Sequence, residues 1–270
     1  MAATARKRAT RAASDIEASV TELYDETLTA LALEELVAGF AVAPPWTVAA
    51  APSGAPRFSP SSSQLPQWPF LVFLLTAAFC LFLSTLYHTF GCAMGRRAFA
   101  LYQGLDFAGI VTLIWGSCVP VLYYGFRCDT ASRNCWMALS TAVGFTLAAS
   151  VMTRKFRSEA WHAVRLASFI GFGFVHIVPI LQIARFERDG ELFLAFVWYG
   201  IAPMGGLYLA GAAVYANNIP ERWYPGKVDL VGNSHQLFHV LVVAAATVHY
   251  AGVLTWMGEL SAIGQLAECA

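Results

Sequence analysis

Five polar residues that can do chemistry lie near the ends of long apolar segments of this chain. Ser84 and His88 are four residues apart at the end of one segment, and Asp106 lies near the start of the next. His235 and His239, again four residues apart, open the last segment. On a helix this spacing places both side chains on one face, with about 6 Å of rise between them. Ionisable groups inside membrane spans are costly and usually functional, so these residues form a candidate site.

The spacing of His235 and His239 allows two imidazoles on one helix to hold a single metal ion. His88 at the same depth would complete the three protein ligands of an open catalytic zinc site, whose remaining position binds water. Asp106 would then serve as the general base, and Ser84 would hydrogen-bond the water or the developing oxyanion. The alternative is that these histidines only form hydrogen bonds between helices. Several ionisable side chains, each costly to place in a membrane, are predicted at the same depth of the bundle, and this clustering favours a metal site.

The remaining histidines have other expected roles. His162 lies in a basic loop and is expected to be solvated, whereas His176 precedes Pro179 within a span and is expected to pack with a hydrogen bond or to line a cavity. His249 is ten residues beyond His239, about 15 Å along a helix, which is too far for the same metal.

The composition of the chain indicates an integral membrane protein. Hydrophobic residues make up 57% of the 270 residues and charged residues only 13%, about half the share of an average soluble domain. The formal net charge of zero gives no broad basic field for nucleic acid. Six segments are long and apolar enough to cross a bilayer as helices: 69–91, 104–126, 136–152, 163–184, 192–216 and 235–257. We therefore predict an all-α, polytopic transmembrane helix bundle.

The chain divides into a bundle and two flanking segments. Residues 1–67 form an N-terminal linker region without the apolar stretch of a signal peptide. Within it, residues 27–52 are a weak span candidate because they contain two glutamates and a Pro-Pro pair, and they form either a poor span or a surface helix. Residues 68–258 form the bundle, and residues 259–270 form a short tail.

The basic residues of the loops predict the orientation of the bundle. Eight lie on one side and five on the other, which marks the first side as cytoplasmic. The eight are Arg96, Arg97, Arg154, Lys155, Arg157, Arg165, Arg222 and Lys227. The candidate site lies at this side. The basic N-terminus is on the same side if residues 27–52 cross the membrane.

The six cysteines are too scattered for a disulfide framework or a zinc knuckle. Cys128 and Cys135 bracket a short polar stretch and can pair in a loop on an oxidising face. The spacing leaves their pairing open.

Several motifs resemble the progestin and adipoQ receptor family, related to haemolysin III, and most closely its adiponectin receptors. They cover about seven-tenths of the chain. They are STLYH (84–88), LDFAGI (105–110), GSCVPVLYYGF (116–126), IPERWYPGKVD (219–229) and SHQLFHVLVVAAATVHYAGV (234–253). The last two are long and highly characteristic.

The resemblance implies a seven-helix bundle with a cytoplasmic N-terminus and zinc near the cytoplasmic face. By motif position His88, His235 and His239 are then the zinc ligands, and Asp106 holds the zinc-bound water. Ser84 lies in the same motif without being a ligand. The family's first helix is not recognisable in residues 1–67, so the first helix is expected to be degenerate or missing.

The leading functional hypothesis is a zinc-dependent amidase of the plasma membrane or an internal membrane that cleaves ceramide-type lipids, an activity that the resemblance implies. The alternative is a receptor in which zinc is structural and an extracellular protein is the ligand. A pore-forming, haemolysin-like role ranks last, because no span carries polar residues repeated at helical spacing. The acyl-chain preference, the extracellular ligand and the oligomeric state stay open.

Overall fold

A computed structural model describes residues 65–186, 190–228 and 231–262 of the chain. The described residues are mainly helical and contain no strands. The first three spans are single helices: α2 (Trp68–Phe90), α3 (Arg96–Gly125) and α4 (Thr130–Val151). The last span is also a single helix, α10 (Ser234–Ala262). The two remaining spans are interrupted helices, Glu159–Arg185 and Glu191–Ala216.

The six spans confirm the prediction of a polytopic helical bundle, although several helices are longer than their apolar segments. Helix α3 begins at Arg96, eight residues before the predicted span, because its first turn contains Arg96 and Arg97 and hydropathy alone does not detect a charged helix start. Helix α4 begins at Thr130, where the Asp129 side chain accepts a hydrogen bond from the Ser132 amide (3.0 Å) and caps the helix. Helix α10 continues to Ala262, into the segment that we expected to be a tail.

Prolines explain both interrupted spans. The fourth span changes from α6 (His162–Val175) to α7 (Ile177–Phe186) at His176, three residues before Pro179. Proline has no amide hydrogen and its ring crowds the preceding turn. In the fifth span, α8 (Gly190–Phe196) is followed by a π-helical turn, η3 (Val197–Ile201), and then by α9 (Ala202–Ala216). Pro203 follows this turn and cannot donate a hydrogen bond to the preceding turn.

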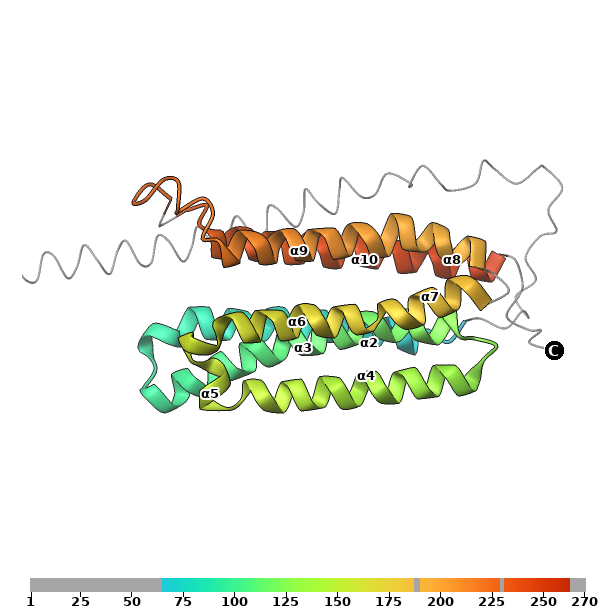
Figure 1. Cartoon of the computed structure of the whole chain (residues 1–270), viewed down its shortest axis with the longest axis horizontal. Coiled ribbons are helices and arrows are strands. Elements are labelled where there is room, and N and C mark those ends of the chain that lie inside the picture. The colour runs from blue at the N-terminus through green and yellow to red at the C-terminus, as the bar shows by residue number, and fades with distance from the viewer. Residues whose placement is uncertain (1–64, 187–189, 229–230, 263–270) are drawn as a thin grey trace, which may run out of the picture. The chain divides into compact units, whose positions relative to one another are not determined.

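The chain forms two compact units, and the larger contains residues 65–205 and 248–262 of the described chain. In it α2 packs along α3, and α3 also contacts α4, α6 and α7 (Figure 1). Glycines let α2 and α3 approach closely, because a Cβ atom at Gly109 would lie 3.1 Å from the Cα atom of Cys80. One core cluster of this unit is aromatic, and in it the rings of Phe196 and Trp256 stack with centroids 4.6 Å apart.

The second unit contains Gly206–Thr247, which includes most of α9, the loop after it and the first half of α10. Gly211 of α9 lies against Phe238 and Leu241 of α10. The loop turns at Asn218, Gly226 and Gly232, which all have positive φ angles. Glycine adopts such angles without a steric penalty. This loop leads directly into the N-terminus of α10, where two residues of the candidate site lie.

The weak span candidate at residues 27–52 and the linker that follows it lie outside the described residues.

Candidate metal centre

The first turn of α10 is held by side chains that cap the helix. The Asn233 side chain accepts a hydrogen bond from the Gln236 amide (2.9 Å), and the Gln236 side chain accepts one from the Gly232 amide (2.7 Å). These bonds satisfy amides that have no partner within the helix. The capped turn fixes the direction in which His235 leaves the backbone.

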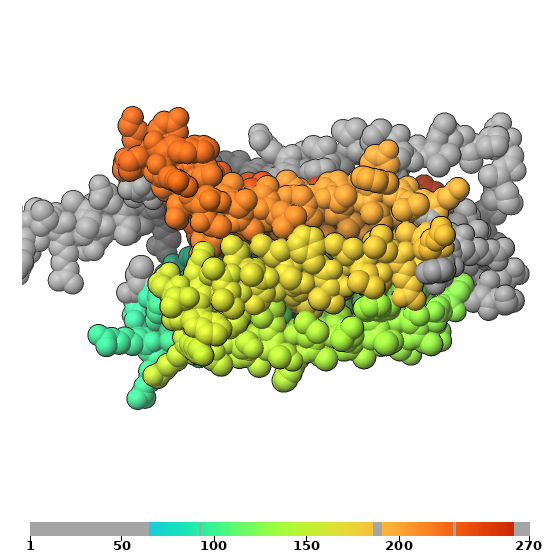
Figure 2. Space-filling view, in the orientation of Figure 1, coloured from blue at the N-terminus to red at the C-terminus, as the bar shows by residue number. Residues whose placement is uncertain are grey.

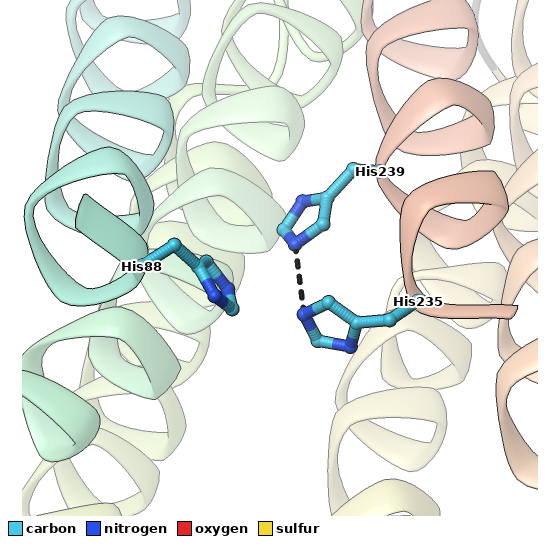
Figure 3. Close-up of side chains that lie close together, drawn as sticks. All are labelled: His88, His235 and His239. Carbon is cyan, nitrogen blue, oxygen red and sulfur yellow. Dashed lines mark hydrogen bonds between the residues drawn. The ribbon is translucent and has the colours of Figure 1, made fainter. Parts of the chain in front are cut away.

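His235 and His239 lie one turn apart on α10, as their spacing predicts. Their Nε2 atoms are 3.1 Å apart, and the dashed line in Figure 3 joins them. The rings of Tyr215 and His235 have centroids 5.4 Å apart, which limits the positions open to the His235 ring. Nitrogen ligands at about 2.0–2.1 Å from a tetrahedral zinc ion are separated by about 3.3 Å. The histidine pair therefore already has the spacing of two zinc ligands.

The close approach of α2 and α3 brings Ser84 and Asp106 together. Both side chains are buried, each with 7% of its surface exposed. The Asp106 carboxyl group lies within electrostatic range of His88, and the Ser84 hydroxyl faces the carboxyl group. Ser84 Oγ forms no hydrogen bond of standard geometry within the described chain. A buried hydroxyl with unused hydrogen-bonding capacity beside a carboxylate suits contact with water or substrate.

The ring nitrogens of His88, His235 and His239 lie within 4.8 Å of one another. Figure 3 shows the His88 ring directed toward the other two. Asp106 does not belong to this cluster in the described part of the chain. The set of three imidazoles fits zinc, which binds His₃ sets and leaves a fourth position for water or substrate. The structure thus brings the three histidines together and places Ser84 beside Asp106. The roles of these five residues stay predictions.

Sequence reasoning missed Glu221, which anchors the start of α10. Glu221 Oε1 accepts hydrogen bonds from the Ser234 amide (2.8 Å) and hydroxyl group (2.7 Å), directly before His235. Desolvation raises the pKa of Glu221, but hydrogen bonds from its own amide and from Ser234, together with the charge of His235, hold this pKa below its ordinary value. The available signal was an acidic residue beside Arg222 in the loop before the last span, 13 residues before Ser234.

Two further histidines lie outside the cluster, as expected. His176 is buried between its hydrogen-bond partners, Ser140 Oγ (2.8 Å) and the Phe172 carbonyl oxygen (3.0 Å). His249 is buried, and its Nε2 atom lies 2.9 Å from the Ser117 carbonyl oxygen in α3. Both are packing residues that satisfy polar groups inside the larger unit.

The pairing of Cys128 with Cys135, which the sequence left open, does not occur. Cys128 is disulfide-bonded, whereas Cys135 is a free, exposed thiol. Cys135 lies on the second turn of α4, so the polar stretch between the two cysteines is largely helical. The sequence alone suggested a loop there.

Six apolar helices define the chain as a multi-pass membrane protein, and three clustered histidines give it a candidate metal centre. The chain belongs to the haemolysin-III related family, whose model matches residues 37–250. This match begins well before α2, so the family similarity extends further toward the N-terminus than the motifs indicated.

Similar proteins are known from plants and animals. The chain is 41% identical over 193 residues to heptahelical transmembrane protein 4 of Arabidopsis thaliana, covering 72% of this chain and 50% of that protein. It is 38% identical over 188 residues to the adiponectin receptor protein of Drosophila melanogaster, covering 68% and 41%, respectively. A progestin and adipoQ receptor-like protein of Caenorhabditis elegans is 35% identical over 184 residues, covering 68% and 42%. The chain spans about half the length of these relatives, and the resemblance seen in the motifs is confirmed.

Proposed function

We propose that His88, His235 and His239 hold a zinc ion and that the protein hydrolyses the amide bond of ceramide-type lipids. The observation that carries the proposal is the cluster of three imidazoles, with ring nitrogens within 4.8 Å, in a protein whose helices span a membrane. A bound zinc ion would polarise the amide carbonyl and lower the pKa of water to about 7.

Asp106 and Ser84 would carry out the proton transfer and the orientation of the reactants. The Asp106 carboxylate accepts a proton from the attacking water, and this proton then passes to the leaving amine. Attack of the water forms the new carbon–oxygen bond and places negative charge on the carbonyl oxygen. The carbon–nitrogen bond breaks once its nitrogen has received the proton, which releases a fatty acid and a sphingoid amine. The Ser84 hydroxyl donates a hydrogen bond to the oxygen on which negative charge develops.

The membrane location supports a lipid amide as the substrate class. The three histidines lie at the ends of spans, so a lipid amide held near the headgroup region is within their reach. We also assign this end to the cytoplasm, because its loops carry eight of the basic residues. The protein would reside in the plasma membrane or in an internal membrane, with its N-terminus in the cytoplasm.

Metal analysis combined with fatty-acid release from ceramide tests the proposal on detergent-purified protein. The parent protein is expected to contain about one zinc per chain, and His239→Ala is expected to lose both zinc and activity because a ligand is missing. His162→Ala is the matched control, since it removes a histidine outside the cluster. A parent protein without zinc, or a His239→Ala variant that hydrolyses ceramide at the parent rate, would refute the assignment.

A second candidate is a receptor in which the metal is structural. The similar Drosophila protein is named adiponectin receptor protein, and this name favours a receptor function. A structural zinc site normally has four protein ligands, whereas the histidine cluster supplies three in the described residues. Zinc content without ceramide hydrolysis would favour the receptor over the enzyme.

A further inference from the structure

A groove between α4 and α6 opens on the surface of the larger unit, and none of the three clustered histidines lines it. Its volume is about 490 Å³, which lies within the range of small-molecule sites. Residues of α4, α6 and the short helix α5 (Arg154–Arg157) line it. These three helices, in green to yellow, lie on the face drawn in Figure 2. The groove therefore runs along two membrane-spanning helices, α4 and α6, and ends at the turn that joins them.

The walls of the groove favour an apolar occupant. The hydroxyl groups of Thr146, Ser150 and Ser168 all donate hydrogen bonds to carbonyl oxygens four residues earlier on their own helices, at 2.7–2.8 Å. Phe172 is 2% exposed and packs within a core cluster of the unit, so its ring is held in place. Because these hydroxyl groups already donate hydrogen bonds within their own helices, a ligand in the groove would make mainly apolar contacts with α4 and α6.

The end of the groove at α5 is strongly basic. Residues 153–166 contain four arginine or lysine residues but only one acidic residue, Glu159. Arg165 fixes the turn by donating hydrogen bonds to the carbonyl oxygens of Phe156 (2.8 Å), which lines the groove, and Ser158 (3.4 Å). Arg154 and Lys155 flank Phe156 on its N-terminal side and are exposed.

The charges at this end repel one another. Desolvation and the neighbouring charge of Arg154 together lower the pKa of Arg157. The Arg157 guanidinium group donates to the Met152 carbonyl oxygen (2.8 Å), which holds it in place. Concentrated positive charge beside an apolar groove matches a ligand with an anionic head and an apolar tail.

We propose that this groove binds an anionic phospholipid of the adjacent leaflet, with an acyl chain between α4 and α6 and the phosphate group beside Arg154 and Lys155. A transmembrane helix from a second copy is a poorer fit, because its own basic flanking residues at this membrane face would meet the same basic cluster. A free phosphate ion would leave the apolar groove without an occupant.

Lipid binding to the full chain, measured by native mass spectrometry in a zwitterionic detergent, tests the headgroup. Phosphatidylserine is expected to bind at least tenfold more tightly than phosphatidylcholine with the same acyl chains. The double variant Arg154→Gln/Lys155→Gln is expected to weaken phosphatidylserine binding about thirtyfold, the effect of two basic residues near an anionic lipid. Arg96→Gln/Arg97→Gln removes the same charge from the exposed start of α3 and is the matched control.

A substitution within the groove tests the acyl chain. A Cβ atom at Gly171, which lines the groove, would have no other atom within 4 Å, so Gly171→Leu fills the groove without a clash at the backbone. Gly173→Leu on the same helix also enters open space but does not line the groove. Gly171→Leu is expected to weaken the binding of both phospholipids at least fivefold, whereas Gly173→Leu should leave it unchanged.

Any of five results would overturn the proposal. The first is equal binding of phosphatidylserine and phosphatidylcholine, and the second is an equal effect of the two double charge variants. The third is unchanged lipid binding by Gly171→Leu. Competition by inorganic phosphate as effective as that by phosphatidylserine would indicate an anion site without a chain. A dimer that Gly171→Leu dissociates would assign the groove to a second copy of the chain instead.

Discussion

Replacing Gly116 by alanine tests whether the close approach of α2 and α3 supports the candidate site. A Cβ atom at Gly116 of α3 would overlap Thr76 Oγ1 of α2, and would lie 2.7 Å from Thr76 Cβ and 2.9 Å from Thr76 Cγ2. Rotation of the threonine side chain can move its hydroxyl and methyl groups, but the Cβ atom is attached directly to the backbone. The added methyl group therefore forces the two helices apart.

The size of this effect can be worked from the distances. Carbon atoms in contact are about 3.5–4.0 Å apart, so the helices must separate locally by about 1 Å. Overpacking of this kind costs about 1–3 kcal/mol. Each kcal/mol lowers the melting temperature of a protein of about this size by roughly 2–4 °C. Gly116→Ala should therefore melt about 2–12 °C below the parent protein.

A matched substitution on α6 separates the steric effect from the effect of the residue type. Gly173 also lies in a helix, and a Cβ atom there would have no other atom within 4 Å. Gly173→Ala should gain up to about 1 kcal/mol from helix propensity. Melting of both variants in the same detergent provides the comparison. If Gly116→Ala melts at or above the temperature of Gly173→Ala, the two helices do not approach as closely as we describe.

The same substitution should disturb catalysis if the proposed function is correct. Ser84 and Asp106 lie on α2 and α3, so separating these helices moves the hydroxyl away from the carboxyl group. A displacement of about 1 Å can reduce the rate of a catalysed reaction about a hundredfold. Fatty-acid release by Gly116→Ala, measured below its melting temperature, should fall while zinc content is largely retained.

Three other perturbations have defined outcomes. Asp106→Asn should retain zinc and lose ceramide hydrolysis, because the amide cannot accept the proton; hydrolysis at the parent rate would exclude Asp106 as the base. Glu221→Ala should weaken zinc binding about 10–100-fold, the usual effect of losing a group that supports a metal ligand, as measured by competition titration with a chelator. The Glu221→Gln variant can still accept hydrogen bonds from Ser234, so it should bind zinc more tightly than Glu221→Ala. Hydrogen bonds from the hydroxyl and amide of Ser132 lower the pKa of Asp129 in the folded protein. The ionised Asp129 side chain therefore stabilises the fold fully at pH values above 3.8, the ordinary pKa of aspartate. This stabilisation is lost as the pH falls through the lowered pKa of the folded state. In Asp129→Asn the melting temperature should therefore depend less on acid pH than in the parent protein. The same dependence of melting temperature on pH in both proteins between pH 5 and 2 would contradict this role of Asp129.

The sequence by itself determined the features that depend on neighbouring residues. Long apolar runs predict membrane helices, because burial in lipid requires an uninterrupted apolar stretch with its backbone hydrogen bonds satisfied within the segment. The geometry of one helix likewise predicted that His235 and His239 share a face, and their Nε2 atoms are 3.1 Å apart. The six spans and this histidine pair could be predicted for the same reason, because both depend on residues that are close together along the chain.

The tertiary structure decided the features that depend on distant segments. Glu221 contacts Ser234 only because a turning loop brings it back to the start of α10, and no period in the sequence encodes that return. Thr76 and Gly116 meet because two helices pack closely, so the role of this glycine becomes visible only when its neighbour is known. The same holds for the disulfide bond of Cys128, which does not involve Cys135, and for the groove beside α5. Such contacts depend on how whole helices pack, whereas hydropathy and spacing describe one helix at a time.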